Sequence, residues 1–133
     1  MILCERKFKL LDEIAKSLSS KDIELIFVDD EQMKELNLKH RNIDKSTDVL
    51  SFPLENVPNA ILGSIVINEN EAQRMATKLN HSLEDEYALL FIHALLHLLG
   101  FDHETDGGQM RQKEAELISK FKLPTSLIVR NEG

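Results

Sequence analysis

The sequence predicts a single α/β (α+β) domain in which a small sheet is packed by about five helices. The chain has 133 residues, 42% of them apolar, without a break in composition, which suits one hydrophobic core. Amphipathic stretches with helical spacing recur along it, and short β-branched runs that end at turn residues lie between them. We therefore expect one domain over residues 1–133, with a loose tail from about residue 124.

The first part of the chain alternates helix and strand signals. Residues 8–18 carry apolar side chains at helical spacing. Residues 23–28 (IELIFV) form a short β-branched and aromatic run, which predicts a buried strand. Asp29 and Asp30 follow it and suit the cap of a second helix, which would turn Met33 inward.

Two further strands are expected in the middle of the chain. Residues 47–54 (TDVLSFPL) and 62–68 (LGSIVIN) are rich in strand-forming residues, and the first run is closed by Pro53. The loop at 55–60 (ENVPNA) that joins them is short. Because a short connection can join only antiparallel neighbours, we expect these two strands to pair antiparallel.

Three helices are expected in the remainder. Asn68 or Asn70 caps the first of them, which has Ala72, Met75, Ala76 and Leu79 on one face. Ser82 caps a central helix that ends at Gly100, where a left-handed conformation is needed. This helix is too short and too interrupted by histidines to span a membrane, so we expect it to be buried. The last helix covers about 109–121.

Charge and cysteine content exclude several classes of protein. Sixteen Lys and Arg against 23 Asp and Glu give a net charge of −7, so no global attraction to nucleic acid or anionic membrane is expected. Residues 1–45 are the less acidic part, with nine bases and ten acids. The single cysteine, Cys4, excludes an internal disulfide, and the N-terminus lacks the features of a secretory signal. These features predict a cytoplasmic protein.

Three histidines in HALLHLLGFDH (residues 93–103) form the most informative pattern. His93 and His97 are four residues apart on the central helix, so their side chains lie about 40° apart around it and about 6 Å apart along it. Gly100 lets the chain turn so that His103 reaches the same point. Three neutral imidazoles leave one tetrahedral position for water, as in catalytic zinc sites. The pattern predicts one hydrolytic zinc ion per chain.

Other interpretations of the neighbouring residues stay open. Each histidine taken singly would more often be a core or surface residue with an ordinary hydrogen bond. Asp102 either orients a ligand from outside the coordination sphere or caps a turn. Met110 either packs beneath the metal or belongs to the core. His40 and His81 are not part of a comparable histidine pattern.

The residue after the first histidine separates two chemistries. The spacing is zincin-like, matching H-E-x-x-H-x-x-G-x-x-H, but Ala94 stands where a peptidase carries its glutamate base. Phosphodiester cleavage needs less from a base, because a metal and a guanidinium stabilise the charge on phosphate oxygens. Arg41, on the expected loop before the strand at 47–54, is the candidate guanidinium; the alternative is a solvated surface charge.

Both segments together resemble the YbeY family of bacterial metal-dependent endoribonucleases, which act in ribosomal RNA maturation. The resemblance rests on RNIDKSTDVLSFP (residues 41–53), LGSIVI (62–67) and HALLHLLGFDH (93–103). It implies zinc at His93, His97 and His103, and a catalytic or RNA-contacting role for Arg41. It also implies a four-stranded mixed sheet, whose fourth strand would come from MILCER (residues 1–6), a cytoplasmic location and association with the small ribosomal subunit.

Two positions depart from the family pattern. Ala94 replaces the usual glycine, which a helix tolerates easily, and Ser64 replaces the usual acid after Gly63. If that acid activates water or positions substrate, the activity of this chain is altered.

The leading hypothesis is a single-strand-specific, zinc-dependent endoribonuclease with Arg41 and His97 as catalytic residues. It would act in ribosomal RNA maturation and small-subunit quality control, with no DNA or membrane partner. Lys39, Arg41 and Lys45 form the basic cluster available to contact RNA. A zinc hydrolase of another bond type, such as a peptidase with a displaced base, is the second hypothesis. A non-enzymatic ribosome-assembly factor with a structural metal is the third.

Overall fold

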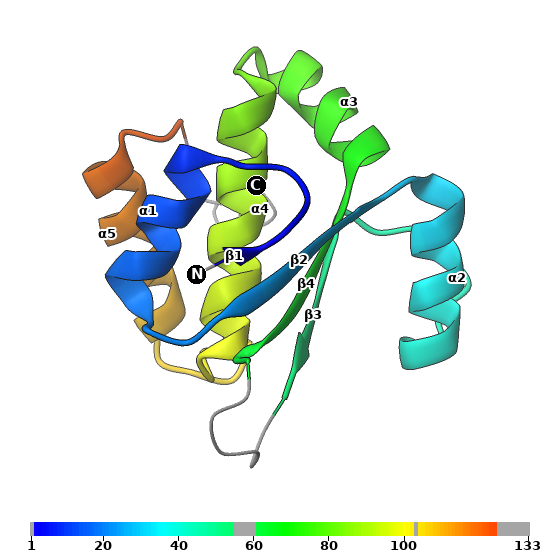
Figure 1. Ribbon diagram of the computed structural model, residues 1–133, viewed down its shortest axis with the longest axis horizontal. Coiled ribbons are helices and arrows are strands. Elements are labelled where there is room, and N and C mark those ends of the chain that lie inside the picture. Colours follow the sequence, from blue (N-terminus) through cyan, green and yellow to red (C-terminus); the bar gives the residue numbers. More distant parts are fainter. Residues whose placement is uncertain (1, 55–60, 103, 125–133) are drawn as a thin grey trace.

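The computed structural model describes residues 2–54, 61–102 and 104–124. Over these residues the chain forms a mixed sheet of four strands and five helices, with strand order β1-β2-β4-β3 (Figure 1). The elements in chain order are β1 (Ile2–Leu3), α1 (Lys9–Leu18), β2 (Ile23–Val28), α2 (Asp30–Arg41), β3 (Val49–Pro53), β4 (Gly63–Asn68), α3 (Glu69–Leu79), α4 (Leu83–Leu98) and α5 (Gln109–Phe121). The predicted α+β class, with a small mixed sheet and about five helices, is confirmed.

The sheet mixes parallel and antiparallel pairs. β2 pairs parallel with β4 over six residues, from Ile23 opposite Gly63 to Val28 opposite Asn68. β1 pairs parallel with β2 over two residues only. β3 pairs antiparallel with β4, as the short connection predicted. The fourth strand is therefore shorter than the expected run over residues 1–6, because the chain leaves the sheet edge after Leu3.

The two faces of the sheet are covered unequally. Helices α1, α4 and α5 lie on one face and α2 lies on the other (Figure 1). The main core lies between the sheet and the three helices, and includes Ile65 and Ile67 of β4. A smaller cluster of Val28, Met33, Leu50 and Val66 lies beneath α2. Successive strand residues point to opposite faces, so Ile65 and Ile67 of β4 belong to the main core and Val66 between them belongs to the smaller cluster.

Helix α4 is the central element of the core. Eleven of its 16 residues are buried, so it lacks the single apolar stripe of a surface helix. The hydroxyl of Ser82 accepts a hydrogen bond from the Asp85 N–H at 3.0 Å, and Gly100 has a φ of 98°, as predicted for the two ends. In the part of the chain that the structure describes, no helix combines the length and apolar character that crossing a bilayer requires.

Close packing at the start of β4 explains its glycine. A Cβ placed on Gly63 would lie 2.5 Å from the carbonyl oxygen of Phe52 in β3 and 2.7 Å from Cδ2 of Leu98 in α4. The absence of a side chain at this position thus lets the end of α4 approach the β3–β4 pair. His97 precedes Leu98, so this contact also determines where the histidine helix ends relative to the sheet.

Buried Asn68 joins three segments at the end of β4. Its side-chain oxygen accepts hydrogen bonds from the N–H groups of Asn70 and Glu71, which identifies Asn68 as the cap of α3. Its amide nitrogen donates to the Asp30 carboxylate at 2.8 Å and to the Thr47 carbonyl at 3.1 Å. One side chain therefore holds the starts of α2 and α3 and the segment leading into β3.

Asp30 adds an ion pair to the same junction. Arg74 of α3 donates to both oxygens of its carboxylate, at 2.7 and 2.9 Å. These hydrogen bonds from Arg74, followed by the one from Asn68, lower the pKa of Asp30 to about 2. Because the folded-state pKa is below the unfolded one, the stabilisation is present above about pH 4 and is lost as pH falls through about 2.

We expect Asp30→Asn to lower the urea midpoint of unfolding at pH 6. The difference in midpoint between wild type and variant should shrink as pH falls from about 4 towards 2. The gap is expected to be small, because the side chains of Asp30 and Arg74 are 43% and 54% exposed and water screens their attraction. Urea titrations of both proteins at several pH values measure it. A gap that stays constant down to pH 2 would contradict this assignment.

Several boundaries differ from the expected ones. β3 begins at Val49, two residues later than predicted, because the preceding residues bond to Asn68 and to one another. On α3, Ala72 and Ala76 are buried as predicted, whereas Leu79 is 36% exposed. The expected loop at 55–60 and the tail after residue 124 lie outside the described residues.

Candidate metal centre

His93 and His97 project from successive turns of α4 towards one point. Their Nε2 atoms are 3.2 Å apart, and their ring centroids are 4.8 Å apart with an interplanar angle of 79°. Both side chains are partly buried, whereas their neighbours on the helix are enclosed in the core. The i, i+4 spacing thus places two imidazoles together, as the sequence predicted.

The other ring nitrogen of each histidine contacts an oxygen acceptor. Nδ1 of His93 lies 3.3 Å from Oε2 of Glu114 in α5, and Nδ1 of His97 lies 3.1 Å from the carbonyl oxygen of Phe101. A carbonyl oxygen only accepts, so Nδ1 of His97 carries the hydrogen and donates it. In neutral His97 the Nε2 lone pair then points towards Nε2 of His93, where both nitrogens could hold one cation.

The distance between these atoms fits a zinc ion. Zinc–nitrogen bonds of about 2.0–2.1 Å at a tetrahedral angle separate two ligand nitrogens by about 3.3 Å. The observed separation is 3.2 Å. The third predicted ligand, His103, lies outside the described residues, and within those ranges no three His, Cys, Asp or Glu side chains gather as a metal cluster. The separation of His93 and His97 is therefore the one that two zinc ligands would have, and all three predicted ligands stay predictions.

A pocket of about 580 Å³ opens beside the histidine pair. One wall is formed by α4 and the segment after it, through His93, Ala94, His97, Gly100, Phe101, Asp102 and Glu104. The other is formed by Val49, Leu50 and Ser51 of β3 with the two residues before them, Thr47 and Asp48. Arg41 also lines this pocket, although 52 residues separate it from His93. The structure thus brings the predicted guanidinium to the same pocket as two of the three predicted ligands, His93 and His97.

Arg41 reaches the pocket from a helix. It is the last residue of α2, so its expected place on a loop was wrong. Asn42, with a left-handed φ of 57°, ends the helix directly after it and turns the chain towards β3. Lys39 and Lys45 are exposed, and neither is among the described residues that line the pocket.

The residues around the histidines have mixed roles. Asp102 lines the pocket, and its carboxylate accepts a hydrogen bond from the Glu104 N–H at 3.1 Å. Of the two roles considered for Asp102, this contact corresponds to the capping of a turn. Met110 is fully buried in the main core. Ala94 also lines the pocket, so the position of the zincin glutamate carries a methyl group there. A ligand-orienting role for Asp102 stays a prediction.

Ser64 lies on the other side of the sheet from the histidines. Its hydroxyl donates to Glu24 of β2 at 2.7 Å, and it shares its face of β4 with Val66, which packs beneath α2. Gly63 and Ile65, on the opposite face of β4, contact α4 or its core. The serine at this position is therefore a change on the α2 side of the sheet, away from the metal pocket.

Two buried glutamates were missed in the sequence. Glu114 and Glu86 have exposed side-chain fractions of 1% and 0%. Glu86, in the first turn of α4, contacts Nε2 of His81 at 2.8 Å. Glu114 carried a detectable signal, because it lies four residues after Met110 and three before Leu117, inside the apolar stripe of α5.

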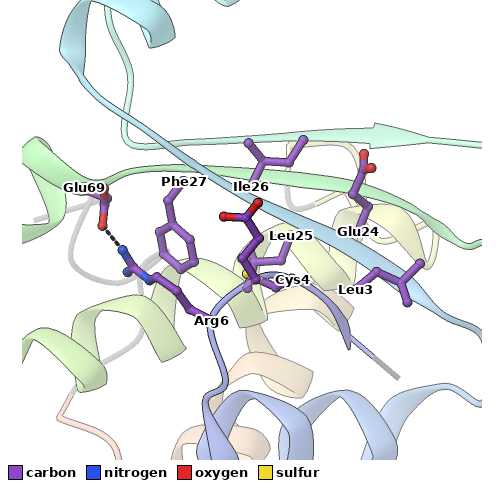
Figure 2. Close-up of a pocket in the computed structure, with 9 residues that line it drawn as sticks. Leu3, Cys4, Arg6, Glu24, Leu25, Ile26, Phe27 and Glu69 are labelled. Atoms are coloured by element: carbon purple, nitrogen blue, oxygen red, sulfur yellow. Dashed lines mark hydrogen bonds and ion pairs between the residues drawn. The ribbon is translucent and has the colours of Figure 1, made fainter.

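A second pocket, of about 640 Å³, lies at the β1–β2 edge (Figure 2). Its guanidinium, Arg6, lies over the Phe27 ring at 4.0 Å and is paired with Glu69, as Figure 2 shows. Tyr87 contacts the same two charged groups. Because Arg6 and Glu69 neutralise each other, we expect this pocket to bind an anionic ligand more weakly than the histidine pocket does.

Together, these features define an α+β domain with a pocket that is lined by two facing imidazoles of a buried helix and by an arginine. The family model described as endoribonuclease YbeY matches residues 3–122. The chain belongs to this family.

Similar proteins agree over nearly the whole chain. The endoribonuclease YbeY of Campylobacter jejuni strain RM1221 is 60% identical over 131 residues, which cover 98% of this chain and 97% of that protein. The Nautilia profundicola protein of the same name is 61% identical, covering 92% of this chain and 88% of its own. The solution structure of TM1509 from Thermotoga maritima matches with a TM-score of 0.60 at 31% sequence identity. The match covers 90% of this chain and 87% of that one.

Proposed function

We propose that this chain is a zinc-dependent endoribonuclease that cleaves single-stranded RNA during ribosomal RNA maturation. The observation that carries the proposal is the facing pair of Nε2 atoms, 3.2 Å apart, in a pocket that Arg41 also lines. The names of its relatives support RNA as the substrate, and the alanine at position 94 disfavours a peptidase.

The proposal gives each residue of the candidate site a role. His93 and His97, with His103 as the predicted third ligand, would hold the ion through neutral imidazoles. A bound zinc ion would supply a Lewis acid that polarises the phosphate and lowers the pKa of water. Arg41 would donate to the non-bridging phosphate oxygens, where charge builds during cleavage. Lys39 and Lys45, exposed near Arg41, would contact the RNA backbone further from the scissile bond.

The cellular setting follows from the same proposal. Ribosomal RNA and the small ribosomal subunit would be the partners in the cytoplasm, in maturation and quality control of that subunit. The net charge of −7 disfavours binding along a long duplex, which supports a single-stranded substrate presented by the ribosome.

The test is a cleavage assay with three substrates. Zinc-loaded protein is incubated with single-stranded RNA, with DNA of the same sequence and with a peptide library, before and after chelation and zinc readdition. We expect RNA cleavage only, lost on chelation and restored by zinc. Peptide cleavage without RNA cleavage would establish the peptidase alternative. Ribosome co-sedimentation without cleavage of any substrate would establish a non-enzymatic assembly factor.

Arg41→Ala is expected to lower kcat for RNA cleavage by about 10²–10³-fold, the usual effect of removing one donor to developing charge. Zinc affinity should stay unchanged, because the guanidinium is not a ligand. Lys34→Ala serves as the control, since Lys34 is an exposed cation on the same helix that pairs with Asp44. Equal losses in both variants would indicate general electrostatic attraction of RNA instead.

A further inference from the structure

Glu114 occupies a place where a carboxylate is costly. Its side chain is 1% exposed and lies on the face of α5 that buries Met110 and Leu117. Removing a carboxylate from water is unfavourable unless hydrogen bonds and opposite charge compensate. No α5 residue is among the described residues that line the metal pocket, but Glu114 contacts His93, which does line it.

The direction of this contact distinguishes it from the other buried glutamate–histidine pair. Glu86 contacts Nε2 of His81, whereas Glu114 contacts Nδ1 of His93. Only in the second pair does the remaining ring nitrogen face another imidazole, that of His97 at 3.2 Å. The Phe101 carbonyl contacts His97 Nδ1 in the same way, but it carries no net charge.

We propose that Glu114 is a positioning residue for the metal centre. It accepts the Nδ1 hydrogen of His93, which selects the tautomer whose Nε2 lone pair faces the pocket, and it places a negative charge behind that ligand. Both effects favour binding of a cation at Nε2, as carboxylate partners of ligand histidines do. The proposal rests on the proposed zinc site and adds a fourth side chain, from a different helix, to it.

The test uses Glu114→Gln, with Glu86→Gln as a matched control at a buried histidine contact outside the pocket. The tautomer of His93 in metal-free protein is read from long-range ¹H–¹⁵N correlations at about pH 8, above the ordinary histidine pKa near 6.5. An amide can accept or donate, so Glu114→Gln should raise the population of the Nε2–H tautomer. Zinc titration should show affinity about 10–100-fold lower. Glu86→Gln should change neither value.

Two outcomes would overturn the proposal. One is an unchanged His93 tautomer in a folded Glu114→Gln protein; the other is an affinity loss that Glu86→Gln reproduces. If Glu114→Gln does not fold, Glu114→Asp replaces it, which keeps the charge at a longer distance and should bind zinc with intermediate affinity. If wild-type protein binds no zinc, the proposed function fails, and the metal-free tautomer still decides whether Glu114 orients His93.

Discussion

His97→Ala is expected to abolish RNA cleavage and to weaken zinc binding by more than the 10–100-fold typical of losing an outer partner. The reason is the facing geometry, because without the second Nε2 the ion loses a ligand that lies 3.2 Å from the first. The protein should stay folded, since this side chain borders a pocket and its loss leaves the Phe101 carbonyl open to water. Calorimetric zinc titration and the RNA assay measure both effects.

His40→Ala is the control for this experiment. His40 is an exposed histidine on α2 whose ring packs at a tilt against Phe52, with centroids 4.9 Å apart, and it is not among the described residues that line the pocket. Its removal should leave zinc affinity and cleavage within about twofold of wild type. If His97→Ala cleaves RNA as fast as His40→Ala does, the histidine pair has no part in the reaction.

Gly63→Ala is expected to lower the free energy of unfolding by about 1–3 kcal/mol or more, a larger loss than Asp30→Asn should cause. The added Cβ would lie 2.5 Å from the Phe52 carbonyl oxygen and 2.7 Å from Leu98, and backbone cannot move aside as a flexible side chain can. Relief of the clash would move the end of α4 away from the sheet and disturb His97. Urea unfolding and zinc titration should therefore both show losses.

Gly107→Ala is the control that shows whether the loss of stability in Gly63→Ala comes from close packing. Both variants add one methyl group to a glycine, but at Gly107 the nearest atoms, in the Gln109 side chain, would be 3.6 Å away, an ordinary contact. We expect its midpoint of unfolding to be close to that of wild type. Equal destabilisation by both substitutions would show that the contact with Phe52 is not responsible, because the lower entropy of the unfolded chain favours alanine at both positions.

The elements with strong periodicity were predictable from the sequence. Ile23–Val28 was predicted as a strand to the residue, and Ser82 and Gly100 bound the central helix as expected. These positions have local causes, namely β-branched runs, side-chain caps and the positive φ that glycine tolerates. The i, i+4 spacing of His93 and His97 likewise placed both imidazoles in one direction before any tertiary information was available.

What the sequence did not reveal depends on contacts between distant residues. The length of β1 depends on where the chain leaves the edge of β2, and the end of α2 at Arg41 depends on Asn42 adopting a left-handed conformation. Glu114 reads as an ordinary acid until α5 is packed against α4, which brings it to His93. The face on which Ser64 lies required the register of β4 with its neighbours.

The burial of α4 has a consequence for how the site persists in time. Helices at a protein surface open locally, whereas amides enclosed in the main core exchange their hydrogens only when the whole domain unfolds. His93 and His97 belong to a helix of the second kind, with 11 of 16 residues buried. The spacing of the two imidazoles is therefore lost only when the whole domain unfolds. Between reactions they keep their arrangement, so no further conformational entropy is lost in bringing them together.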